Sequence, residues 1–347
     1  MRRHVWKRRF LRYFIGSLAA IVLICIPAAA QFGGITGLYA FVCMQLRNPH
    51  ETVAESAVIL PAPESADTVT ESAYIGKTSY STTDKQPDTY SPTSTPTPAS
   101  ERVPSGYAPE IVNHTNYSVD PSALFDADGL RLALDGTPEI LIVHTHSSES
   151  FAADAENPYL PDDVMRTLDT KYNVVRLGDE ISAALEAAGI GVLHDREIND
   201  YPSYNGSYSQ MLKRVNQYLA DYPTIKMVID VHRDAVLDAD GNNLALRTEI
   251  DGEQYAKLMF VVGTDAGGLS HPDWRENLSF AATMQGWGDS LYPGLMRSID
   301  LRAERFNQHT TAASVIVEVG SAGNTLGEAL RGAGCFAEIL LHTLGMQ

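Results

Sequence analysis

Ionisable side chains of the kinds that bind zinc follow three separate apolar runs in this sequence. The runs are residues 139–143, 225–229 and 314–319, and the ionisable residues at or near their ends are His144, His146, Glu149, Asp230, His232, Asp234 and Glu318. If the runs are parallel strands of one sheet, their carboxyl ends meet at one edge. Ligand sites of open α/β sheets lie at that edge.

Two or three imidazoles and one carboxylate make a zinc site, and a further carboxylate that does not bind the metal can act as a general base. The candidate metal ligands are therefore His144, His146, Glu149 and His232. His144 and His146 share a face only if the strand continues past them, so the sequence leaves open which of them is a ligand. A phosphatase-like site and a non-haem iron site use similar residues and remain alternatives.

Glu318 is the candidate general base. It lies near the end of a run rich in β-branched residues, and Gly320 and Gly323 follow it at an expected turn. The structural alternative is a glutamate paired with a surface Lys or Arg. Asp230 and Asp234 lie two residues on either side of His232, and a carboxylate next to a ligating histidine usually orients its ring.

The segments around these runs predict alternating strands and helices. Helices are expected at 179–189, 207–221, 273–291, 297–307 and from a capping box at Thr325 to about 344, with a strand at 190–195 and a hairpin of 244–250 with 257–262 around Asp251 and Gly252. This alternation is typical of an α/β fold with a mostly parallel sheet flanked by helices.

Composition limits the possible partners. The chain has 347 residues and a formal net charge of -17, although its first dozen residues are strongly basic. An acidic main domain argues against nucleic-acid binding. Of the 3 cysteines, only Cys335 lies in the globular part, within an apolar helical pattern. A disulfide framework and a thiolate zinc site are therefore not expected there.

The N-terminal third predicts an anchor and a tether. Residues 1–13 form a basic cytoplasmic head, and residues 14–44 carry no charge and are long enough to span a bilayer. A cleaved signal peptide ending near Gln31 is the competing interpretation. Residues 45–106 are rich in Ser, Thr and Pro and predict a disordered linker, which leaves 107–347 as the catalytic domain outside the membrane.

Several motifs, in order, resemble the stage II sporulation protein P family. They are residues 140–149, 230–234, 277–281, 293–297, 306–308 and 318–325, and the match runs from about 138 to 344. The anchor and the tether agree with the layout of that family. The family is similar in fold to zinc-dependent N-acetylmuramoyl-L-alanine amidases, so the resemblance implies an amidase-like domain.

The resemblance also implies roles for individual residues. In the amidases a strand-end His, a Glu and a second His bind zinc, and a Glu in a Val-Glu-x-Gly-x-x-x-Asn segment is the base. Residues 317–324 match that segment with Glu318 as the base, and His232 matches the second His. The first His corresponds to His144 or His146. Glu149 is the expected carboxylate ligand, although the amidases take theirs from the start of the next helix.

The implied function is a zinc-dependent peptidoglycan hydrolase that cuts the amide between N-acetylmuramic acid and L-alanine. The family is also credited with endopeptidase cleavage of cross-links, and its setting is septal wall thinning and engulfment during sporulation. Stage II sporulation proteins D and M are the implied partners. The expected location is the cell membrane, with a single span and the catalytic domain in the septal or intermembrane space. A non-catalytic wall-binding module and a zinc carboxypeptidase are the alternatives.

Overall fold

The computed structural model describes residues 107–125, 130–160 and 165–346. The predicted basic head at 1–13, the anchor at 14–44 and the linker at 45–106 lie outside the described residues. Within the described ranges, no helix combines the length and the apolar character needed to cross a bilayer. The fold below is that of the region predicted to be the catalytic domain.

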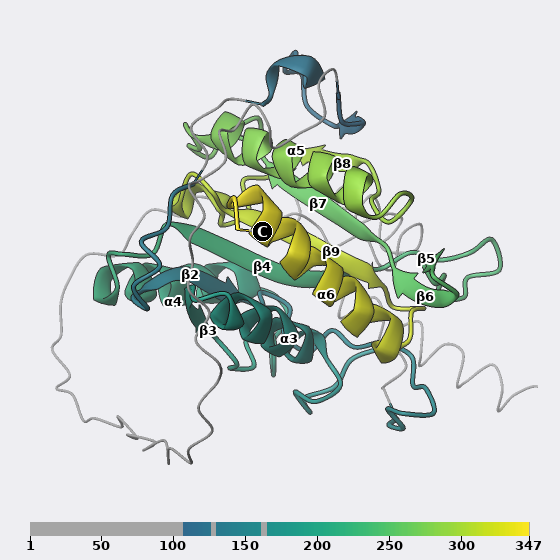
Figure 1. Cartoon of the computed structure of the whole chain (residues 1–347). Helices are drawn as coiled ribbons and strands as arrows, with labels where there is room; N and C mark the ends of the chain where they lie inside the picture. Colours follow the sequence, from purple (N-terminus) through teal and green to yellow (C-terminus); the bar gives the residue numbers. More distant parts are fainter. Residues whose placement is uncertain (1–106, 126–129, 161–164, 347) are drawn as a thin grey trace, which may run out of the picture. The chain divides into compact units, whose positions relative to one another are not determined.

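A seven-stranded sheet with the order β1-β8-β7-β9-β4-β2-β3 forms the centre of this region (Figure 1). The strands are β1 (Ile111–Asn113), β2 (Pro138–Val143), β3 (Gly191–His194), β4 (Met227–Asp234), β7 (Leu258–Gly263), β8 (Ile299–Arg302) and β9 (Val315–Ser321). Every neighbouring pair is parallel except β7 and β9, which are antiparallel. The prediction of a mostly parallel sheet in an α/β fold is confirmed.

Helices cover both faces of this sheet. They are α3 (Val174–Ala187), α4 (Ser207–Asp221), α5 (Trp274–Leu291) and α6 (Leu326–Thr343), with short 3-10 turns η2 (Pro121–Ala123) and η3 (Gln308–Thr310). Residues that alternate along a strand point to opposite faces. Ile142 therefore belongs to the core under α3, α5 and α6, whereas Val143 packs with Met211 and Val215 of α4 on the other face.

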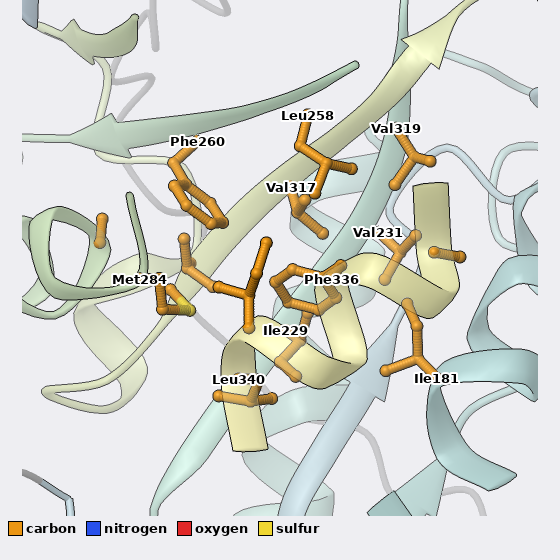
Figure 2. Packing of buried hydrophobic residues seen from close by; sticks show 14 of the residues in the cluster. Ile181, Ile229, Val231, Leu258, Phe260, Met284, Val317, Val319, Phe336 and Leu340 are labelled. Carbon is orange, nitrogen blue, oxygen red and sulfur yellow. The ribbon is translucent and has the colours of Figure 1, made fainter. Parts of the chain in front are cut away.

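The larger core lies between α6 and the middle strands. Figure 2 shows Phe336 and Leu340 of α6 beside Ile229 of β4 and Val317 of β9, and all four side chains are fully buried. Burying one large apolar side chain contributes roughly 1.5–3 kcal/mol. The middle strands, whose ends carry the predicted site, are thus anchored by the buried core under α6.

A small hairpin precedes β7. Strands β5 (Arg247–Ile250) and β6 (Glu253–Ala256) are antiparallel and joined by Asp251 and Gly252. Both turn residues have positive φ, 51° and 85°, as a two-residue type I′ turn requires. The predicted turn is confirmed. The strand predicted at 257–262 also occurs, as β7, but its predicted pairing is wrong, because β6 pairs with β5 and β7 joins the main sheet.

The helix expected at 297–307 is not formed. The segment contains strand β8, and η3 begins just after it at Gln308. Ile299 and Leu301 are buried, whereas Asp300 and Arg302 between them are partly exposed. Buried and partly exposed residues thus alternate along this segment, which is the pattern of a β-strand. This alternation outweighs the helix propensity of the residues that follow.

A glycine in α3 makes room for two buried histidines. A Cβ on Gly178 would lie 2.4 Å from Nε2 of His194 and 2.6 Å from Nε2 of His144. We expect Gly178→Ala to lower the free energy of unfolding by about 1–3 kcal/mol, because the rings must leave their positions. Urea unfolding of the full chain measures this change.

Gly334 in α6 is the matched control. It is also a helical glycine, but a Cβ there would meet no atom within 4 Å. Gly334→Ala should therefore raise the free energy of unfolding by about 0.5–1 kcal/mol through helix propensity alone. Equal effects of the two substitutions would show that the histidines under α3 are not tightly packed.

Candidate functional site

The three strand ends that carry the predicted residues lie side by side. Strands β9, β4 and β2 are adjacent and parallel, so their carboxyl ends meet at one edge of the sheet. The register pairs His232 of β4 with Glu318 of β9. Neighbouring residues of paired strands share a face, so both side chains face the α4 side of the sheet.

His146 reaches the site because β2 ends at Val143 and the chain turns. Its buried ring stacks on Tyr204, with centroids 4.3 Å apart, and meets the ring of His232 edge-on at 5.4 Å. Burial lowers the pKa of His146 to about 4, so the imidazole stays neutral. Its Nδ1 is buried and has no hydrogen-bond partner among the described residues.

His232 lies between two carboxylates. Its Nδ1 is 3.4 Å from Oε2 of Glu149, and its Nε2 is 3.0 Å from Oδ1 of Asp230. The second pair is close but not aligned, so Nε2 has no hydrogen bond within the described part of the chain. Burial lowers the pKa of His232, but the negative charges of Asp230 and Glu149 outweigh burial and raise it well above its usual value.

Glu149 joins this cluster from the loop that follows β2. Its Oε2 accepts a hydrogen bond from the backbone N–H of Arg233 at 3.2 Å. Burial raises the pKa of Glu149, but the hydrogen bond with His232 and the charge of Arg233 outweigh it and hold the pKa below the usual value. Glu149 is therefore a buried carboxylate that stays ionised beside His232.

The two aspartates near His232 have different partners. Asp230 accepts hydrogen bonds from the backbone N–H and the hydroxyl of Thr145, at 2.8 and 2.5 Å, and so joins the middle of β4 to the loop after β2. An irregularity in β4 between His232 and Asp234 shifts the register, and Asp234 pairs with Arg297 at 2.8 Å. Asp230 thus contacts His232, whereas Asp234 turns to Arg297.

Glu318 faces the cluster with a free carboxylate oxygen. Its Oε2 is shielded from solvent and has no hydrogen-bond partner among the residues that the structure describes. Burial raises the pKa of Glu318 to about 8, with the nearby charges of Asp234 and Glu149 adding to the effect against the opposing charge of His232. A general base works best with a pKa near the working pH, and Glu318 has that property.

His144 lies on the other face of the sheet from this cluster, and its role as a metal ligand stays a prediction. It is one residue past Val143, on the side of the sheet that faces α3. Its Nε2 is 2.8 Å from Nε2 of His194, and its Nδ1 is 3.1 Å from the carbonyl oxygen of Val231. Strand alternation continues as far as His144 and places it on the face opposite His232, whereas the turn redirects His146.

Two tyrosines of the site were not singled out from the sequence. Tyr204 and Tyr208 come from the loop before α4 and its first turn, and both rings contact His146. The guanidinium of Arg166 lies 4.2 Å from the ring centroid of Tyr204. The density of tyrosines in residues 201–208 was the sequence feature that could have indicated their role in the site. The segment does not follow an apolar run that ends in charged residues, which was the pattern used to find the other site residues.

The donor types at the site suit a zinc ion. His146, Glu149 and His232 offer two imidazoles and a carboxylate. Each histidine has a buried nitrogen that makes no hydrogen bond to a described residue. In the described ranges, no three His, Cys, Asp or Glu side chains already converge as a metal ligand set. Metal binding would therefore require these side chains to move closer together, while their chemistry fits the ion.

Comparison with known proteins gives one family match and one curated relative. The family model described as Stage II sporulation protein P (SpoIIP) matches residues 46–341. The curated Stage II sporulation protein P of Bacillus subtilis (strain 168) is 27% identical in an alignment of 215 residues, which covers 58% of this chain and 49% of that protein. This chain thus spans about half the length of the curated relative it matches.

Solved structures also resemble this chain. The CwlD amidase from Clostridioides difficile, in complex with the GerS lipoprotein, is 11% identical with a TM-score of 0.39 and covers 59% of this chain and 98% of its own. The N-acetylmuramyl-L-alanine amidase Ami1 of Mycobacterium smegmatis is 14% identical with a TM-score of 0.36 and covers 61% and 99%.

Proposed function

Because the chain belongs to the stage II sporulation protein P family, we propose that it is a zinc-dependent peptidoglycan hydrolase that cleaves the amide between N-acetylmuramic acid and L-alanine. One observation carries the proposal. The ends of three adjacent parallel strands bring His146, Glu149, His232 and Glu318 together on one face of the sheet. Two imidazoles, an ionised carboxylate and a carboxyl of raised pKa are the groups that metal-assisted amide hydrolysis needs.

His146, Glu149 and His232 would hold the zinc ion, which supplies when bound a Lewis acid for the amide carbonyl and a lowered pKa for water. The negative charges of Asp230 and Glu149, which raise the pKa of His232, also favour a divalent cation there. Asp230 lies 3.0 Å from Nε2 of His232, is itself held by Thr145, and would orient the ring of His232. Such an outer carboxylate typically contributes about 10- to 100-fold to metal affinity or activity.

Glu318 moves the proton in this mechanism. Its Oε2 has no partner among the described residues and can accept the proton of the attacking water. The water oxygen bonds to the carbonyl carbon, and the carbon–nitrogen bond breaks as the same proton passes to the L-alanine nitrogen. A single carboxyl thus acts first as base and then as acid. Shielding from solvent strengthens its interaction with the charge that develops.

The biological setting is part of the proposal. The catalytic domain would act outside the membrane, anchored by residues 14–44 and extended by the linker at 45–106. Septal wall thinning and engulfment during sporulation would be its process, and stage II sporulation proteins D and M its partners. The family supports this setting, while the anchor and the linker rest on composition alone.

The products of hydrolysis test the proposed bond. The full chain, supplied with zinc, should convert a purified disaccharide carrying its stem peptide into free disaccharide and a free stem peptide with a new L-alanine amino terminus. Mass spectrometry separates the two fragments. Shortened stem peptides still attached to sugar would favour the zinc carboxypeptidase. Retention on purified wall without any cleavage would favour the wall-binding module.

A further inference from the structure

Tyr208 is held over the same face of the sheet as His232 and Glu318. Met211 and Val215 follow it on α4 at positions three and seven residues later, and both pack against β2 and β4. Residues at this spacing share one face of a helix. Tyr208 therefore continues the sheet-facing stripe of α4 to the strand ends, where its ring meets that of His146 edge-on at 5.5 Å.

A second segment fixes the position of Tyr208. The side-chain amide of Asn307 donates a hydrogen bond to the carbonyl oxygen of Tyr208 at 2.9 Å, and the ring of Phe306 lies 5.5 Å from that of Tyr208. Phe306 has a φ of 51°, a left-handed conformation that costs a non-glycine residue about 1–2 kcal/mol. Backbone strain that is kept next to an ionisable cluster is typical of functional sites.

The hydroxyl of Tyr208 can donate a hydrogen bond. Its ring contacts His146, and the same cluster contains Glu149 and Asp230, whose carboxylates only accept hydrogen bonds when ionised. A tyrosine hydroxyl is a neutral donor at neutral pH, unlike the carboxylates near it.

We propose that Tyr208 is a further catalytic residue, whose hydroxyl donates a hydrogen bond to the carbonyl oxygen of the scissile amide as negative charge develops on it. This inference rests on the proposed hydrolysis and adds a donor to it. Glu318 and the other carboxylates around the cluster cannot fill this role while ionised, because they repel a developing oxyanion. A neutral donor that is already in place is the group that an oxyanion requires.

Tyr208→Phe tests the proposal because it removes the hydroxyl and keeps the ring. With a soluble disaccharide–stem peptide as substrate, we expect kcat to fall by about 10²-fold, the typical loss for one oxyanion donor. The KM, the zinc content and the melting temperature should stay at wild-type values. A phosphinate analogue of the scissile amide should bind more weakly by the same factor as the loss in kcat/KM, which a merely structural role would not produce.

Tyr218→Phe is the matched control, since Tyr218 lies on the same helix, half-buried against the apolar cluster of α4 and β2. Its kcat should equal that of the wild type. A wild-type kcat for Tyr208→Phe would overturn the proposal, and so would a loss that is accompanied by a lower melting temperature or less zinc. A wild-type chain that does not cleave the substrate would instead overturn the proposed function, and the role of Tyr208 with it.

Discussion

Glu318→Gln is expected to lower kcat for amide cleavage by about 10²–10⁴-fold, the usual contribution of a general acid–base group. The amide has the shape of the carboxyl but cannot take the proton of water. His146, Glu149 and His232 are unchanged, so bound zinc should remain at the wild-type level. Cleavage of the disaccharide–stem peptide and zinc content, measured on the same preparation, give both results. A variant with more than a tenth of the wild-type rate would remove Glu318 from the mechanism.

The same substitution should stabilise the metal-free protein. Folding raises the pKa of Glu318 to about 8 from the value of 4.5 for an unperturbed glutamate, so the ionised carboxyl opposes folding. This cost is absent below pH 4.5, grows as the pH rises and levels off above about pH 8. In the presence of a chelator, Glu318→Gln should therefore gain about 1 kcal/mol at neutral pH and nothing at pH 4. Urea unfolding at several pH values checks the sign.

A matched pair of substitutions separates the two histidines after β2. His146→Asn should remove bound zinc and lower activity. The loss of activity should exceed roughly 10- to 100-fold, which is the usual effect of removing a residue that only hydrogen-bonds to a metal ligand. His144→Asn should keep zinc and activity, because His144 faces His194 and Val231 on the other side of the sheet. Asparagine can still donate to the carbonyl oxygen of Val231, which limits the damage to folding.

The stability of the two variants should show the opposite order. His144 is fully buried and hydrogen-bonded, so its replacement should cost about 1–3 kcal/mol of folding free energy. Nδ1 of His146 is buried without a hydrogen-bond partner in the described part of the chain, so replacing His146 should cost less. If His144→Asn loses zinc while it remains folded, or if His146→Asn keeps zinc, the placement of the two rings described above is contradicted.

The sequence predicted the parts of this fold that repeat a strong local pattern. Helix α4 was expected at 207–221 and occurs there, and the capping box at Thr325 begins α6. The apolar runs that became β2, β4 and β9 were recognised because buried parallel strands are continuously apolar. Their adjacency followed from the general rule that ligand sites lie at the carboxyl ends of parallel strands.

Other features depended on tertiary contacts that one sequence does not display. Which of His144 and His146 enters the site depends on the residue at which β2 ends, and a shift of one residue reverses the face. The segment at 299–302 became a strand because neighbouring strands bury Ile299 and Leu301. Tyr208 reaches the site through the packing of α4 on the sheet, so its role depends on the arrangement of elements that are distant in sequence.

Metal analysis of the purified full chain is the most direct test that this site is a zinc centre. We predict close to one zinc per chain in the wild type and almost none in His232→Ala, since His232 would be a ligand. Full zinc in both proteins would place the metal elsewhere. A folded wild-type chain that contains no metal, and that gains no hydrolytic activity when zinc is added, would contradict the hydrolase and favour a wall-binding module.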